Sequence, residues 1–234
     1  MKSSLPLWLL ALALIAIFVA LGRWQLRRGD EKQALLDASA RVLHERHALS
    51  LSELSRQDDS ALAWVDGRGE FEIAPALLLD NQRHGDAVGV HVYRVFRPAG
   101  GRSLLVDLGW LPLPGDRRLP FVPRPEGVQS LRGLFAPPPA AGVALGPAFI
   151  AEPGHSWLMT RIDLQALAQG LKRDLAPRVL RLDPALSIGY ARDLDVLPNT
   201  LPPERHRGYA VQWFGLAVAT AVAALILHFR RRPA

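Results

Sequence analysis

Three side chains near the C-terminus, His206, Tyr209 and Trp213, have residue types and a spacing that could do chemistry. On a helix that extends back through Arg205, their spacing places them on one stripe of the helix surface. A neutral imidazole beside aromatic rings is suited to act as an axial ligand of haem iron. Tyr and Trp also gather at membrane boundaries by default. The pattern therefore leaves two interpretations open, a haem ligand at His206 and an interfacial aromatic belt.

Basic side chains flank this stripe. Arg205 and Arg207 stand on either side of His206, and Arg23 lies near the other end of the chain. Guanidinium groups pair with carboxylates such as haem propionates through charge-assisted hydrogen bonds, but arginines beside apolar segments are also ordinary membrane anchors. They are compatible with both interpretations.

A Trp–Gln pair occurs twice, as Trp24-Gln25 and in reverse order as Gln212-Trp213, each time beside a long apolar segment. If the two segments cross a membrane in opposite directions, both pairs lie at the same membrane face as His206. The predicted haem-binding residues are His206, Tyr209, Trp213, Trp24, Gln25 and Arg23, with His206 as the metal ligand.

The apolar segments predict transmembrane helices at residues 5–22 and 207–229. The second segment, Tyr209–Phe229, is long enough to span a bilayer and has few polar residues. The first, Leu5–Leu21, has no charged residue but is at the short end of spanning length. Because Lys2 precedes it and small residues end it, a cleaved signal peptide is the alternative.

The basic residues around the two segments give conflicting indications of orientation. Arg230-Arg231-Arg232 after the second segment favours a cytoplasmic C-terminus. Four basic residues follow the first segment closely and favour a cytoplasmic location for the part between the segments. Charge alone therefore leaves the topology open.

Residues 30–203 predict one β-rich domain with short helices. Asp30–His47 has the pattern of an amphipathic helix after a break at Gly29, and short helices are expected at Ser50–Leu54 and Ile162–Leu171. Alternation of apolar and polar residues predicts strands at Trp64–Ile73, Ala76–Gln82, Val88–Phe96, Arg102–Trp110, Val128–Phe135, Arg178–Leu182 and Ser187–Arg192. The expected fold class is membrane α+β: two transmembrane helices flanking one extracytoplasmic antiparallel domain of barrel or sandwich form.

Composition excludes several classes of function. The chain has no Cys and only two Met, so thiol chemistry is excluded and Cu(I) transport, which favours sulfur ligands, is disfavoured. The formal charge of +6 arises largely from arginines beside the apolar segments, where they meet lipid headgroups, so no nucleic-acid partner is expected. Nucleophile elbows, phosphate-binding loops and zinc-helix motifs are absent from the sequence, and we do not expect an enzyme.

Across nearly its whole length, the sequence resembles the Surfeit locus protein 1 family. The motifs that carry the resemblance are, in chain order, Gly22-Arg23-Trp24-Gln25-Leu26-Arg27-Arg28 with Lys32, Gly67 to Phe71, Leu79-Asp80-Asn81 with Gly85 and Gly89, Val106 to Pro112, Trp157 with Asp163-Leu164, and His206-x-x-Tyr209-Ala210-x-Gln212-Trp213-Phe214. One position departs from the family pattern, because Asp107-Leu108 stands where the family usually has Asn-Arg.

The resemblance implies an assembly factor for cytochrome c oxidase that assists insertion of haem a into the catalytic subunit. It implies a retained first span, cytoplasmic termini and a periplasmic domain in a multi-pass protein of the bacterial inner membrane. His206 matches the family's proposed haem-linked histidine. The implied cargo is transiently bound haem a, and the implied partners are the catalytic subunit, haem a synthase and the lipid bilayer.

Two further functions stay open at this point. The chain could be a membrane-anchored scaffold that holds an oxidase subunit during assembly without binding haem. It could also be an anchored enzyme or receptor, unrelated to respiration, that uses a groove in the sheet.

Overall fold

A computed structural model describes residues 5–55, 61–139, 146–151, 156–197 and 200–230 of the chain. Contacts divide it into two units. The first combines residues 1–37 with residues 200–234, and the second contains residues 38–199. The N- and C-terminal apolar helices and the β-rich part between them confirm the expected fold class.

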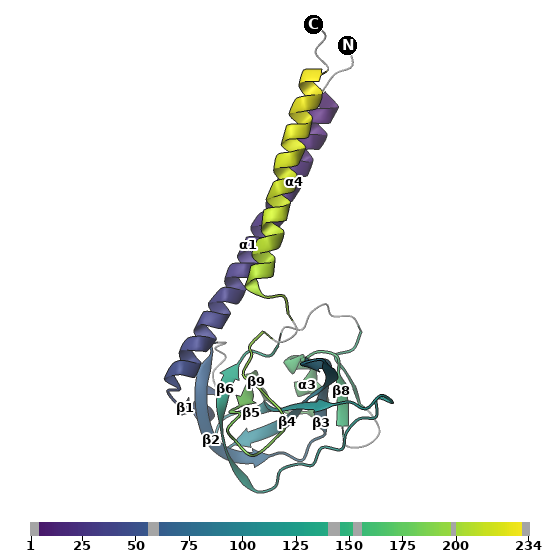
Figure 1. The fold of residues 1–234 in the computed structure, drawn as a ribbon. Coiled ribbons are helices and arrows are strands. Elements are labelled where there is room, and N and C mark those ends of the chain that lie inside the picture. Colours follow the sequence, from purple (N-terminus) through teal and green to yellow (C-terminus); the bar gives the residue numbers. More distant parts are fainter. Residues whose placement is uncertain (1–4, 56–60, 140–145, 152–155, 198–199, 231–234) are drawn as a thin grey trace. The chain divides into compact units, whose positions relative to one another are not determined.

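The first unit is built from two long helices, α1 (Leu5–Glu45) and α4 (Pro203–Arg230), which run side by side in opposite directions (Figure 1). Both are long and apolar enough to cross a membrane. Only 11% and 17% of their most apolar stretches are buried, so neither resembles the core helix of a soluble protein. The break expected at Gly29 is wrong, since α1 continues as one helix to Glu45. Arg231 and Arg232, which entered the topology argument, lie outside the described residues.

The second unit is a sheet with short helices. Its strands are β1 (Leu49–Ser50), β2 (Ala63–Phe71), β3 (Ala76–His84), β4 (Ala87–Pro98), β5 (Ser103–Pro112), β6 (Val128–Ala136), β7 (Phe149–Ala151), β8 (Ser156–Met159) and β9 (Leu175–Leu182), and its helices are α2 (Leu51–Leu54) and α3 (Leu164–Leu171). The expected helix at Ile162–Leu171 is confirmed as α3, which begins after the N-cap Asp163.

The sheet closes on itself. Its order is β1-β2-β6-β9-β5-β4-β3-β8-β7, and β2 also pairs with the end of β4. This extra pairing makes a ring of β2, β6, β9, β5 and β4, from which β3, β8 and β7 extend. The barrel form expected from the sequence is thus present, and closure leaves few free strand edges.

Pairing is more mixed than the sequence predicted. Most neighbours are antiparallel, but β1–β2, β3–β8 and β5–β9 are parallel. The strand expected at Ser187–Arg192 is wrong, because Ala191 makes a single bridge to Trp110. Strands β7 and β8 were not predicted, since they are too short for alternation to be visible in the sequence.

Because successive side chains of a strand point to opposite faces of the sheet, the strands contribute to two apolar clusters, one on each face. On β4, Val92 and Phe96 belong to one cluster, whereas Tyr93 and Val95 belong to the other. The second cluster is covered by α3 through Leu167. Burial on both faces explains why the central strands are so apolar.

A charged group is buried within this apolar sheet. Asp107, one of the two residues that depart from the family pattern, is 4% exposed. Its Oδ1 is 3.1 Å from His91 Nδ1 and accepts a 2.9 Å hydrogen bond from the Gly109 N–H. Its other oxygen lies 3.9 Å from Arg181 Nε. The carboxylate is thus satisfied inside the fold, as a buried charge requires.

Asp107 makes the free energy of unfolding of this unit depend on pH. Burial alone would raise the pKa of Asp107, but the hydrogen bond and charge of His91, the charge of Arg181 and the Gly109 N–H hold it below its usual value. A carboxyl with a depressed folded-state pKa stabilises fully above its unfolded pKa of about 4 and loses this contribution as the pH falls through the folded value.

We expect Asp107→Asn to lower the free energy of unfolding by about 3 kcal/mol at pH 7, because it leaves Arg181 without its buried counter-charge. The loss should shrink as the pH falls below about 4, because the unfolded wild-type chain binds a proton at Asp107 there before the folded chain does. Unfolding of the full chain in detergent at several pH values measures both effects. Asp116→Asn, at an exposed pair with Arg118, is the control and should change little. A deficit that stays constant into acid would contradict an ionised Asp107.

Candidate functional site

Small residues line the face of α4 that packs on α1. Pro203, Ala210, Ala217 and Ala224 are buried at intervals of seven residues, as in the seam of a coiled coil. Other apolar side chains of α4, such as Val211 and Val218, are exposed and suited to contact lipid tails. Small residues at such a seam let helix backbones approach closely. Within a bilayer, where burial of apolar side chains does not drive association, this close packing is one of the interactions that hold helices together.

Two glycines of α1, one heptad apart, set the closest approach. A Cβ atom on Gly22 would lie 2.7 Å from the ring of Phe214. A Cβ atom on Gly29 would lie 3.3 Å from the Pro203 carbonyl oxygen and 3.4 Å from His206 Cβ. A larger side chain at Gly29 would press on the backbone of α4, and one at Gly22 would displace the Phe214 ring.

Gln25, between these glycines, binds the predicted haem ligand. His206 is 7% exposed, and its Nδ1 lies 2.7 Å from Gln25 Oε1. A carboxamide oxygen accepts but does not donate, so Nδ1 must carry the proton. In the neutral imidazole this leaves the lone pair on Nε2.

Nε2 of His206 is buried and has no hydrogen-bond partner among the described residues. Burying a polar atom without a partner is costly, so such an atom in a native fold needs an explanation. Histidines that bind metals almost always donate their other N–H to an oxygen, which fixes the tautomer and aims the free nitrogen. The Gln25–His206 pair therefore has the geometry that an oriented metal ligand would need, although other atoms cover Nε2.

Charged residues of both helices make contacts near the beginning of α4. Lys32 Nζ donates a 2.5 Å hydrogen bond to the carbonyl of Leu201, in the segment that leads into α4. Across the helix pair, Arg207 Nη2 lies 3.9 Å from Asp30 Oδ1. These contacts tie the two chain segments together next to His206.

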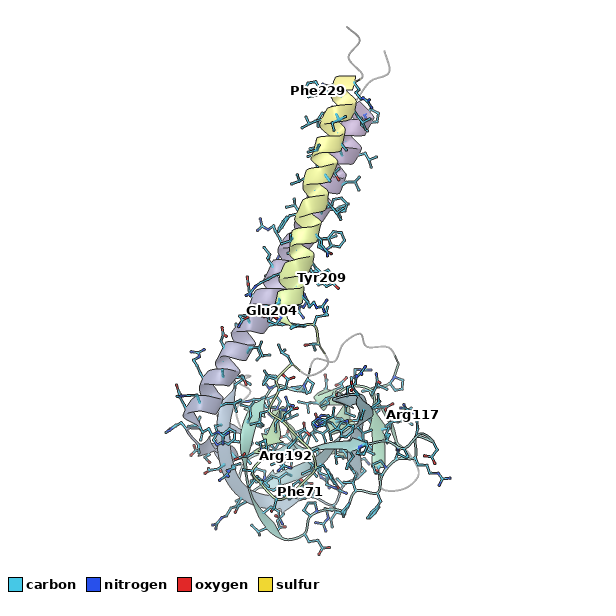
Figure 2. The ribbon with its side chains drawn as sticks, in the orientation of Figure 1. Phe71, Arg117, Arg192, Glu204, Tyr209 and Phe229 are labelled. Carbon is cyan, nitrogen blue, oxygen red and sulfur yellow. The ribbon has the colours of Figure 1, made fainter. Side chains whose placement is uncertain are left out.

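The other predicted haem-binding residues make no hydrogen bond or ring contact with the Gln25–His206 pair among the described residues. Trp213 is partly buried, and its ring stacks on Phe18 with centroids 5.9 Å apart. Tyr209 is 39% exposed on α4, toward its Glu204 end (Figure 2). Trp24 is 50% exposed and Arg23 is also exposed. The structure brings together Gln25 and His206, and leaves Tyr209, Trp24 and Arg23 on the outer surface of the helix pair.

The sequence reasoning missed the residues that shape this site. Gly29 lies beside His206 and the Pro203 carbonyl, Phe18 stacks on Trp213, and the Phe214 ring lies against Gly22. A signal was present, because Ala210, Ala217 and Ala224 repeat every seven residues and Gly22 and Gly29 have the same spacing. Reading that repeat would have identified the packed faces of both helices.

A second histidine joins the helices at the other end of the pair. Trp8 Nε1 donates a 3.3 Å hydrogen bond to Nδ1 of His228. This imidazole is partnered through an indole rather than a carboxamide, and it offers a natural comparison for His206.

Comparison with known proteins places most of the chain in one group. A family model described as the SURF1 family matches residues 12–218, which include most of α1, the part of α4 that carries His206, and the whole β-rich unit. No curated protein matches the chain.

We expect Gly29→Leu to force α1 and α4 apart beside His206, because the leucine side chain has no room against Pro203. Diethyl pyrocarbonate, which modifies accessible imidazoles, should then react with His206 roughly tenfold faster than in the wild type. The modified residue is identified by peptide mass. Gly208→Leu is the control, since a side chain there meets no atom within 4 Å among the described residues. Equal reactivity of His206 in all three proteins would refute the idea that Gly29 keeps this site closed.

Proposed function

The chain belongs to the SURF1 family, and from this premise we propose that it delivers haem a to the catalytic subunit of cytochrome c oxidase during assembly. The family is associated with cytochrome c oxidase assembly. Haem a is cargo in this proposal, held for a time and then passed on. The protein acts as a chaperone without a catalytic step of its own.

One observation carries the proposal: the buried, unpartnered Nε2 of His206, with Nδ1 held by Gln25. Haem iron accepts a neutral imidazole nitrogen as an axial ligand. The donor atom, its tautomer and its fixed ring orientation fit that role. Gln25 is then a positioning residue for His206.

Burial of Nε2 is consistent with a carrier rather than a permanent haem protein. The helix pair must loosen beside Gly29 and His206 before iron reaches the nitrogen. When only a fraction of the protein is in the binding-competent state, the apparent affinity falls by that fraction. A weakened affinity favours release to an acceptor, as an assembly factor requires.

The outer residues of the helix pair have supporting roles in the proposal. Trp213, Tyr209 and Trp24 offer aromatic surface to the porphyrin, and they lie on the segments where the helices leave the apolar region. Arg23 is exposed and available for a propionate. None of these side chains needs to reach Nε2.

The proposed location is the bacterial inner membrane, with both termini in the cytoplasm and the β-rich unit in the periplasm. Two apolar helices support membrane anchoring. An even number of spans returns the chain to its starting side. The implied partners are the oxidase catalytic subunit and haem a synthase, which would supply the cargo.

A scaffold that holds an oxidase subunit without binding haem is the second candidate function. The covered state of His206 Nε2 favours it, since the nitrogen is not accessible in this conformation. Under this alternative, the Gln25–His206 pair is only a hydrogen bond that locks the two helices together.

The two functions predict different haem contents. We expect full-length protein, purified from cells that make haem a, to show a Soret band that is lost in His206→Ala and retained in His228→Ala. Gln25→Leu should lower haem affinity about tenfold, because removing a partner that orients a metal ligand typically costs 10–100-fold. Retention of the full Soret band in His206→Ala would remove this histidine from haem binding. If the wild-type protein co-purifies with the oxidase subunit but contains no haem, the scaffold function is favoured.

A further inference from the structure

Two adjoining hollows lie on one side of the β-rich unit, where the β2–β3 connection meets the proline-rich connection from β5 to β6. Their volumes are about 740 and 460 Å³, and they share Ile73 and Arg124. We call the two hollows together the docking surface. All of its residues belong to the second unit.

Large apolar side chains project from the docking surface. Ile73 is 85% exposed, Phe121 is 79% exposed and Val128 is 65% exposed. Scattered apolar residues are common on proteins, but three such side chains around one pair of hollows form a patch. Aromatic and aliphatic anchors of this kind dominate the energy of many protein interfaces.

Arg94 fixes the two connections that carry Ile73 and Phe121. It is 4% exposed, and it donates hydrogen bonds to the carbonyls of Ala74 and Val122 at 3.1 and 2.5 Å. Ala74 follows Ile73 and Val122 follows Phe121 in the chain. A buried guanidinium therefore clamps both connections while their apolar side chains stay in solvent. Such preorganisation lowers the entropic cost of binding a partner.

The docking surface is positively charged. Five arginines line it, against two glutamates, Glu70 and Glu72. Glu72 is buried and already bound by Arg97 and Arg173, at 3.2 and 2.7 Å. Among the described residues, Arg68 and Arg124 have no carboxylate partner. Arginines at an apolar patch are suited to bidentate contact with carboxylates of a partner.

We propose that the docking surface binds an acidic polypeptide segment whose apolar or aromatic side chain enters the hollows beside Ile73 and Phe121. In line with the proposed function, on which this inference rests, the segment belongs to the oxidase catalytic subunit. A protein segment fits better than anionic lipid. The surface is hollowed rather than convex, and the exposed Glu70 would face the headgroup phosphates.

The first test is co-purification of the oxidase catalytic subunit with the full-length protein in detergent. We expect Ile73→Asp/Phe121→Asp to weaken capture about tenfold or more, as truncation of interface anchors does. Both side chains are exposed, so the variant should keep wild-type thermal stability and haem content. Val88→Asp, at an exposed apolar position in the β3–β4 hairpin, is the control and should capture normally.

The outcomes separate the two proposals. If the wild type does not capture the subunit, the proposed function fails. If the wild type and the double variant capture it equally, the docking surface is wrong and the proposed function stands.

A photo-reactive benzoylphenylalanine in place of Phe121 identifies the occupant in cells. We expect a cross-link to the oxidase subunit, at a peptide of net negative charge. Adducts with lipid would overturn the proposal in favour of a membrane contact. A missing adduct, with capture intact, would place the partner elsewhere on the protein.

Discussion

Close packing of α1 against α4 at two glycines is the constraint on which the candidate site depends. Gly22 and Gly29 have no side chain to keep the helices apart, and this closeness lets Gln25 reach His206 across the seam. The hydrogen bond then fixes the imidazole tautomer and leaves a lone pair on a covered nitrogen. In a membrane, where apolar side chains gain little from leaving lipid, such steric fit and polar contacts are what hold a helix pair together.

The sequence predicted the kinds of elements better than their details. Alternation found the central strands because they are long and have one clear period, and the apolar segments marked both helices. It did not reveal the parallel pairing of β5 with β9, because pairing depends on tertiary contacts far apart in the chain. The break expected at Gly29 failed because this glycine permits close packing rather than ending the helix.

In the candidate site, too, the sequence predicted the important residues but not how they are arranged. Residue types alone pointed to His206, and the paired Trp–Gln motifs pointed to Gln25, but no sequence pattern showed that the two side chains meet. Tyr209 shares the predicted stripe yet is not buried with His206, because the packed face of α4 follows the alanines instead. Asp107 shows how a departure from a family motif can be absorbed. His91, Arg181 and the Gly109 N–H satisfy its buried charge locally.

The most direct measurement of the central claim is ¹⁵N NMR of the histidine side chains in the full-length protein, with His206 assigned by loss of its signals in His206→Gln. The account predicts a neutral ring with the proton on Nδ1 and a bare Nε2 near pH 7. A proton on Nε2, or a ring that titrates as freely as a solvent-exposed histidine, would contradict the buried bond to Gln25 and remove the physical basis for a haem ligand at this position.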